Sequence, residues 1–104
     1  MNFYPKKTTY QAGGLAITLD YFDDEIKCIM PWGVLTVNLG IHLPDNQAFV
    51  DINNLDCETI NSVMSLGIMK PVVDAKGKPV FRQSGFVSYP LYEFDLDKIE
   101  EAAA

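Results

Sequence analysis

Histidine and cysteine are scarce in this 104-residue chain, and their scarcity excludes most nucleophilic and metal chemistry. His42 is the only imidazole, so any Ser–His or Cys–His pair would have to include it, and no G-x-S-x-G motif surrounds a serine. The two cysteines, Cys28 and Cys57, follow no zinc-ligand spacing. We therefore expect no enzymatic activity, no catalytic residue, no metal and no cofactor.

Long apolar runs and positive charge are also lacking. No stretch approaches the roughly 18 apolar residues of a transmembrane helix, and no apolar run follows the N-terminal lysines as in a signal peptide. Eight basic residues against fourteen acidic ones give a net charge of −6. This balance disfavours direct contact with nucleic acid or an anionic membrane, and it suits a basic protein partner or simple solubility. We expect a cytoplasmic protein with reduced thiols.

The remaining composition is that of a globular domain, with 48% hydrophobic and 12% aromatic residues. A chain of this length buries roughly two-thirds of its unfolded surface without disulfides or metals. No internal repeat or linker divides it. A single domain over residues 1–104 is therefore expected.

Apolar and polar residues alternate in several segments, which predicts β-strands. The expected strands are 15–22, 25–30, 34–43, 48–52 and 84–95. The first two are separated by Asp23–Asp24 and form a predicted hairpin. Pro90 confines the last strand to an edge, a bulge or a break.

The apolar period changes to about 3.6 after Asn53 and Asn54, which predicts a helix over 57–66. Asn54 or Asp56 would cap its N-terminus, and Gly67 would end it. We expect Cys57 to be a small core residue on the apolar stripe of this helix. The cluster Asp51, Asn53 and Asn54 then marks the strand-to-helix corner.

The C-terminal segment is also helix-prone, because Asp97 and Glu100 have the spacing of a capping box. The predicted fold class is α+β. An antiparallel sheet would carry one main helix packed on one face, with a short C-terminal helix beside it.

A resemblance to a known family rests on four segments, which are LAITL (15–19), LTVNLG (35–40), AFVDINN (48–54) and SGFVSYPLYEFD (84–95). In this order and spacing they resemble small bacterial proteins described as domain of unknown function 4313. The chain departs from the pattern at EIKCIMPWG and in the loop near 70–78. The resemblance implies a mobile genetic element, whose small accessory proteins are often anti-CRISPR or anti-restriction inhibitors. It implies no catalytic role.

Two acidic segments are the candidate partner-binding surfaces. The residues assigned to them are Asp20, Asp23, Asp24, Glu25, Tyr92, Glu93, Asp95 and Asp97. Carboxylates at 20–25 could also hold Ca²⁺, but they lack the spacing of an EF-hand loop, so a solvated hairpin tip is the better interpretation. We predict a non-enzymatic inhibitor that blocks the basic nucleic-acid-binding surface of a host protein.

Other interpretations remain. A small molecule could bind in a pocket between the sheet and the predicted helix, rimmed by Asn38, Asp51, Asn53 and Asn54. The loop 70–82 has a local charge of +3, so the polarised surface could promote head-to-tail self-association into a homo-oligomer, although surface charge runs usually serve solubility. A purely structural module is the third interpretation.

Overall fold

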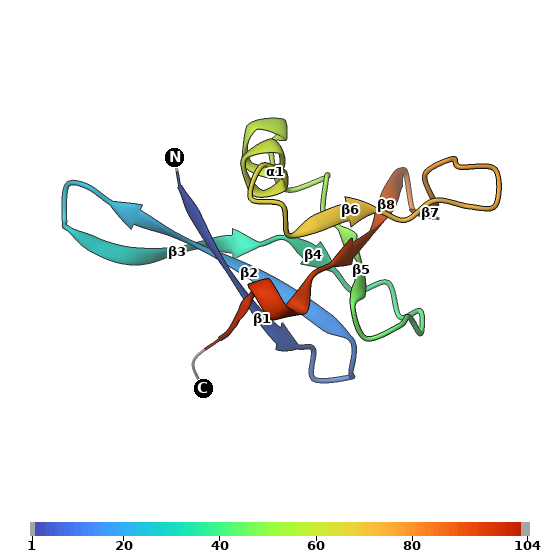
Figure 1. Ribbon diagram of the computed structural model, residues 1–104, viewed down its shortest axis with the longest axis horizontal. Helices are drawn as coiled ribbons and strands as arrows, with labels where there is room; N and C mark the ends of the chain where they lie inside the picture. The colour runs from blue at the N-terminus through green and yellow to red at the C-terminus, as the bar shows by residue number, and fades with distance from the viewer. Residues whose placement is uncertain (1, 103–104) are drawn as a thin grey trace.

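A computed structural model describes residues 2–102, which form two sheets and one short α-helix (Figure 1). The first sheet has the strand order β3–β2–β1–β9, and the second has the order β4–β5–β8–β6, with β7 also paired to β8. The strands of the first sheet are β1 (Phe3–Thr9), β2 (Leu15–Asp23), β3 (Cys28–Val34) and β9 (Glu100–Glu101). Those of the second are β4 (Thr36–Val37), β5 (Gln47–Val50), β6 (Met69–Pro71), β7 (Phe81–Ser84) and β8 (Val87–Phe94). The helix α1 covers Cys57–Met64.

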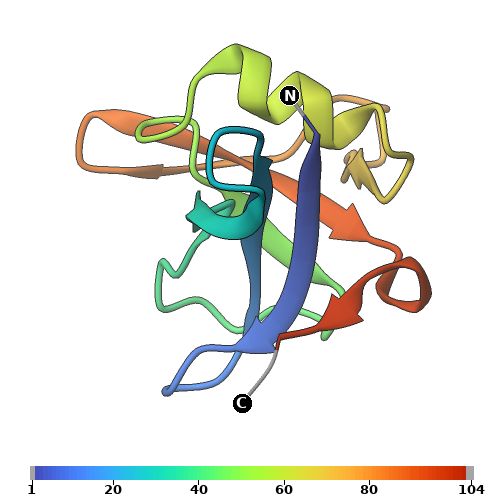
Figure 2. The ribbon, with the colours of Figure 1, turned by 90° about the vertical axis from the view of Figure 1, so that its left-hand side faces the viewer.

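The two sheets are joined by one continuous segment, because β3 runs into β4 through Leu35. This residue is fully buried. Its N–H donates to the Ile17 carbonyl at 2.8 Å, and its carbonyl accepts the Asp51 N–H at 2.9 Å. Leu35 therefore fastens β2 of the first sheet to the end of β5 in the second. Seen along the long axis, the strands of the two sheets cross steeply (Figure 2).

The main core lies between the sheets and under α1. Its fully buried members include Ile17, Leu35, Val50 and Val63. Phe49 points the other way, into a second cluster with Tyr89 and Leu91. Ala48, Phe49 and Val50 are all buried because β5 is covered on both faces. This is why the sequence there shows an unbroken apolar run instead of alternation.

The predicted fold class is wrong, because strands dominate and the helix α1 has only 8 residues. Asp56 does cap it, since its side chain accepts the Thr59 N–H at 2.8 Å, and Gly67 follows it with a φ of 74°. However, Cys57 is exposed, so its predicted core role is also wrong. Buried contacts of the helix come from Thr59 and Val63.

The expected C-terminal helix is a 3-10 turn, η1 (Leu96–Lys98), followed by β9, which pairs in parallel with β1. Glu100 forms an ion pair with Lys6 and caps no helix. Ile99 is buried, and the Ala102 N–H donates to the Lys7 carbonyl at 2.8 Å. The open edge of β1 thus overrides the local helix propensity of the tail, because pairing satisfies backbone groups that would otherwise stay free.

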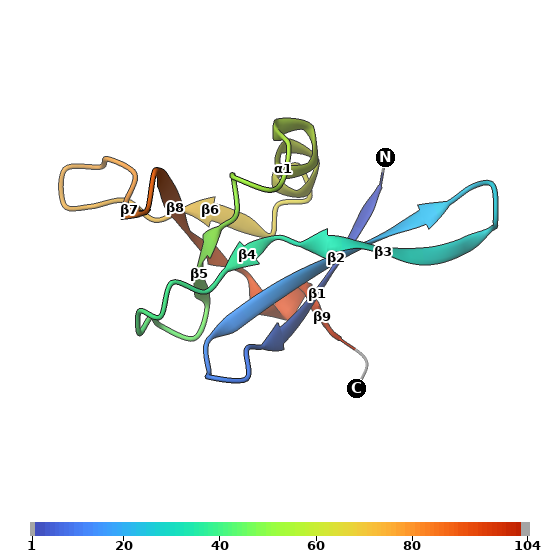
Figure 3. The same cartoon turned by 180° about the vertical axis from the view of Figure 1, so that it is seen from behind.

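The molecule is elongated, with principal extents of 46 × 28 × 27 Å. The β2–β3 hairpin projects at one end of the long axis. The loop that precedes β7 projects at the other, as the front and back views show (Figures 1 and 3). The expected strand 34–43 ends at Val37, and residues 38–46 form an irregular connection that carries the exposed His42.

Candidate functional site

The predicted hairpin is confirmed, and its tip holds the first group of acidic residues. Tyr21 pairs with Met30, Phe22 with Ile29, and Asp23 with Cys28. Asp23 Oδ1 accepts the N–H groups of Glu25 at 2.9 Å and of Ile26 at 3.4 Å. The Asp23 carboxylate therefore organises the turn, as short polar side chains often do at turns.

Asp24 and Glu25 follow Asp23 at the tip, and both are exposed. Within the described residues 2–102, neither they nor Asp20 form an ion pair. Asp20 lies opposite Tyr4 on one side and Pro31 on the other, on the outer face of the first sheet. Within that part of the chain, Asp24 and Glu25 are thus exposed and without an ion pair, and the half-buried Asp20 is also without one.

Large apolar side chains accompany these carboxylates. Phe22 and Ile29 face each other across the hairpin and are 40% and 50% exposed, and Ile26 at the tip is 55% exposed. We call residues 20–29 the acidic hairpin. Trp32 stacks edge-on against Phe3 and Tyr21, at ring-centroid distances of 5.3 and 5.2 Å. These contacts anchor the base of the hairpin while its tip stays exposed.

The second predicted group lies on a different sheet and is largely engaged within the chain. Glu93 lies 3.3 Å from the Lys70 ammonium and accepts a hydrogen bond from the Asn46 amide at 3.2 Å. Asp95 lies 3.8 Å from Lys98 Nζ. The half-buried Tyr92 packs against the main core. Of the residues in this second group, only Asp97 is both exposed and without an ion pair within the described chain. The structure therefore does not join the two groups into one acidic surface.

A basic end lies opposite the acidic hairpin along the molecule. We define it as residues 73–86, comprising the loop before β7, β7 itself and the turn into β8. Its cationic side chains Lys76, Lys78 and Arg82 are exposed. Asp74 Oδ1 accepts the N–H groups of Lys76 at 2.8 Å and Lys78 at 3.0 Å, so this carboxylate is held by the turn.

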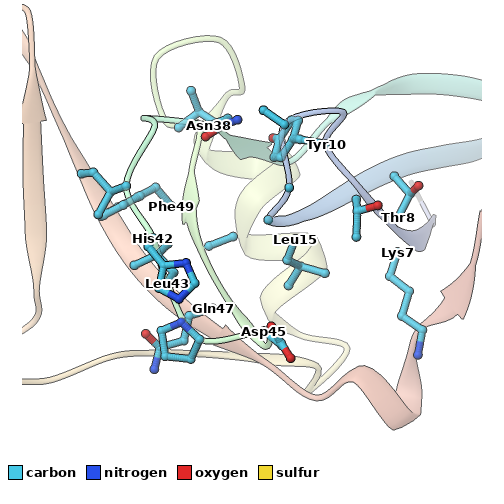
Figure 4. Close-up of a pocket in the computed structure, with 18 of the residues that line it drawn as sticks. Lys7, Thr8, Tyr10, Leu15, Asn38, His42, Leu43, Asp45, Gln47 and Phe49 are labelled. Atoms are coloured by element: carbon cyan, nitrogen blue, oxygen red, sulfur yellow. The ribbon is translucent and has the colours of Figure 1, made fainter.

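A hollow of about 850 Å³ opens between the end of the β1–β2 hairpin and the 38–46 connection (Figure 4). Leu15 and Phe49 contribute apolar surface, and Tyr10, Asn38 and His42 contribute polar groups. The Tyr10 hydroxyl lies 2.8 Å from Thr36 Oγ1. Burial raises the pKa of Tyr10, while the hydrogen bond to Thr36 opposes that shift. The Tyr10 hydroxyl is thus already engaged by Thr36 at the wall of the hollow.

This hollow is not the predicted pocket between the sheet and the helix, because Asn38 lines it but Asp51, Asn53 and Asn54 do not. Asp51 is buried and accepts from the Asn54 N–H at 3.2 Å and the Asn54 side-chain amide at 2.8 Å. Asn53 is exposed. The polar cluster therefore builds the strand-to-helix corner, as its position before the helix predicts.

Residues 2–102 also bear on metal binding and membrane crossing. In this part of the chain no three His, Cys, Asp or Glu side chains are grouped so that they could hold a metal ion. None of its helices has the length and apolar character required to cross a membrane.

Sequence reasoning overlooked the hollow and the apolar part of the acidic hairpin. The hollow depends on an irregular connection, for which residue patterns give no signal. The hairpin did give one, because Phe22 falls out of phase with the buried Leu15, Ile17 and Leu19. A large apolar side chain on the polar phase of a strand indicates an exposed contact surface.

These features define a two-sheet β-protein with oppositely charged, apolar-flanked projections. The family described as domain of unknown function (DUF4313) matches residues 7–104, and the chain belongs to that family. The resemblance carried by the four segments is thereby confirmed. No curated protein and no solved structure matches the chain.

Proposed function

We propose that this chain is a non-enzymatic binding protein whose acidic hairpin occupies the basic nucleic-acid-binding surface of another protein. The observation that carries the proposal is the combination of unpaired, exposed carboxylates with exposed Phe22, Ile26 and Ile29 on one projecting hairpin. The family resemblance adds a context: an accessory protein of a mobile genetic element that inhibits a host defence nuclease of the CRISPR or restriction type.

The mechanism is competition for cationic side chains. Asp20, Asp24 and Glu25 would take the place of backbone phosphates against the lysines and arginines of the partner. The apolar residues would supply the desolvated contacts that give such an interface most of its binding energy. A net charge of −6 would accelerate the encounter at low salt.

The contribution of the second acidic group is smaller in this proposal. Glu93 and Asp95 already have lysine partners, so a new cation gains less from them. They and Asp97 add to the negative field around the chain, whereas Tyr92 supports the core. The contact itself is assigned to the acidic hairpin.

Affinity capture with matched variants tests this proposal. The tagged chain is compared with Asp20→Asn/Asp24→Asn/Glu25→Gln, and with a control that neutralises three exposed carboxylates outside both acidic groups, Asp45→Asn/Glu58→Gln/Glu101→Gln. We expect the wild type and the control to capture a nucleic-acid-binding host protein, and duplex DNA or RNA to displace it. The hairpin variant should not capture it. Equal recovery on all three, or recovery unaffected by nucleic acid, would contradict the proposal.

A second candidate function is binding of a small molecule in the hollow. Its volume of about 850 Å³ lies within the range of ligand sites, which usually measure about 300–1,000 Å³, and its lining mixes apolar side chains with polar ones. Native mass spectrometry of the protein purified from its host would show a retained mass. Leu43→Trp narrows the hollow and should abolish the retained mass, whereas Leu66→Trp on the exposed surface should leave that mass unchanged.

A further inference from the structure

The two projections of this molecule carry opposite charge. Residues 20–29 contain four carboxylates and one lysine, a formal charge of −3, and residues 73–86 contain three cations and one carboxylate, a formal charge of +2. They lie at opposite ends of the 46 Å long axis (Figures 1 and 3). The two projections are too far apart to touch each other within one chain, so a contact between an acidic hairpin and a basic end needs a second molecule.

Both projections also expose apolar side chains beside their charges. At the basic end Phe86, at the turn between β7 and β8, is fully exposed, and Val73 and Phe81 are 51% and 55% exposed. The acidic hairpin exposes Phe22, Ile26 and Ile29 to a similar degree. Apolar residues surrounded by charge are typical of surfaces that bind another protein.

We propose that the basic end of one copy binds the acidic hairpin of a second copy, head to tail. This goes beyond the proposed function, because the partner is the chain itself. The contact joins two different surfaces, so a bound pair leaves one free acidic hairpin on one copy and one free basic end on the other. Such a heterologous contact continues into longer assemblies and does not stop at a dimer unless a ring closes.

The contact should be weak and sensitive to salt. The two ends contribute 10 and 14 residues, whereas a stable interface uses about 20–30 residues on each side. Charges at the rim of a small interface act mainly through screened, long-range attraction. At low salt, we expect association to grow as the protein concentration rises from about 10 μM to about 1 mM. It should be lost at about 0.5 M salt.

Charge reversal at one end at a time tests the proposal. The acid-reversed chain carries Asp24→Lys/Glu25→Lys, and the base-reversed chain carries Lys76→Glu/Lys78→Glu. All four side chains are exposed. The tip turns are held by the carboxylates of Asp23 and Asp74, which stay unchanged. Matching thermal unfolding of the variants and the wild type controls for the fold.

Sedimentation velocity then gives the answer. Each single-end variant alone should associate at least about tenfold more weakly than the wild type. An equimolar mixture of the two should regain association, because a chain with two positive projections, of formal charge +1 and +2, meets a chain with two negative ones, of −3 and −2. The doubly reversed chain should regain association as well. A wild type that stays monomeric at low salt would overturn the proposal, as would a mixture that fails to associate.

The same variants separate this proposal from the function proposed above. The base-reversed chain keeps its acidic hairpin intact, so it should lose self-association and still capture the partner. Loss of partner capture in the base-reversed chain alone would count against the assignment of that contact to the acidic hairpin. It would leave the result of the mixing experiment unaffected.

Discussion

At the scale of single residues, Asp51 fixes the corner where β5 turns toward α1. Its carboxylate is buried, and both of its oxygens accept hydrogen bonds from Asn54. Its carbonyl accepts the Leu55 N–H at 3.2 Å, and its own N–H donates to Leu35. The backbone of Asp51 bonds to Leu35 and Leu55 and its side chain bonds to Asn54, so this one residue joins the strand to the corner. Removal of its side chain should therefore destabilise the whole fold.

Asp51→Ala should lower the free energy of unfolding by about 1–3 kcal/mol, because it removes two hydrogen bonds and leaves the Asn54 amide without its acceptor. Urea denaturation of the variant measures this. Asn53→Ala, which changes the exposed neighbour, should stay within about 0.5 kcal/mol of the wild type. Equal effects of the two changes would show that the buried carboxylate has no special role.

The helix cap gives a pH dependence at residue scale. The Asp56 side chain accepts from Thr59, which lowers the pKa of this carboxyl from its ordinary value of 3.8. The cap therefore stabilises the fold above that ordinary value, and this stabilisation is lost as the pH falls through the lower pKa of the folded state. Asp56→Asn keeps a capping oxygen but cannot titrate.

We expect Asp56→Asn to unfold at a lower urea concentration than the wild type near pH 6. The difference should shrink as the pH falls from about 3.8 through the lower pKa of the folded state, where the wild-type carboxyl also becomes neutral. Urea midpoints measured from pH 6 downward check this. A constant difference across the range would mean that the charge of Asp56 does not contribute.

At the scale of elements, the C-terminal strand completes the first sheet. Ile99 is buried in the main core directly before β9, and the Lys6–Glu100 ion pair lies in the same register. The hydrogen bond from Lys6 and the positive charge of Lys6 lower the pKa of Glu100. The tail is therefore part of the fold and not an appended helix.

Ile99→Ala should lower the free energy of unfolding by about 2–5 kcal/mol, as expected for a buried aliphatic side chain. Glu101→Ala, at an exposed neighbour, should have little effect. Amide exchange adds a second measurement, because the Ala102 N–H is bonded to Lys7 and should exchange slowly in the wild type and quickly in Ile99→Ala. Fast exchange in the wild type would contradict a docked tail.

Elements with a clear apolar period could be predicted from the sequence, and those defined by long-range pairing could not. The alternation of Leu15, Ile17 and Leu19 predicts β2, and the Asp56 cap predicts α1. β1 gave no signal, because only Phe3 of its residues is buried. β9 is a strand only because the distant edge of β1 is open beside it, a fact that local propensity cannot contain.

The candidate site was predictable to the same extent. Asp23 ends one strand, and Asp24 and Glu25 precede the next, so local turn chemistry places the three together. Glu93 is different, because Lys70, which pairs with its charge, and Asn46, which donates a hydrogen bond to it, come from distant segments and reach it only in the folded chain. Charge counted along the sequence therefore overestimates that acidic surface.

At the scale of the whole molecule, Leu35 makes the two sheets one folding unit. It belongs to the segment that crosses from β3 to β4, it is fully buried, and its backbone bonds to Ile17 and Asp51. The main core draws residues from both sheets, including Ile17 from β2 and Val50 from β5. Neither sheet can bury its inner face without the other, so unfolding should be cooperative.

Leu35→Ala should therefore lower the free energy of unfolding by about 2–5 kcal/mol and shift one shared transition. Fluorescence of Trp32 reports on the first sheet, and amide signals of β8 in NMR spectra report on the second. Both should give the same urea midpoint in the wild type and the same lowered midpoint in Leu35→Ala, whereas Leu66→Ala at an exposed position should leave both unchanged. Midpoints that separate in the variant would show that each sheet folds independently, and the crossing segment would then be a linker and not the centre of the core.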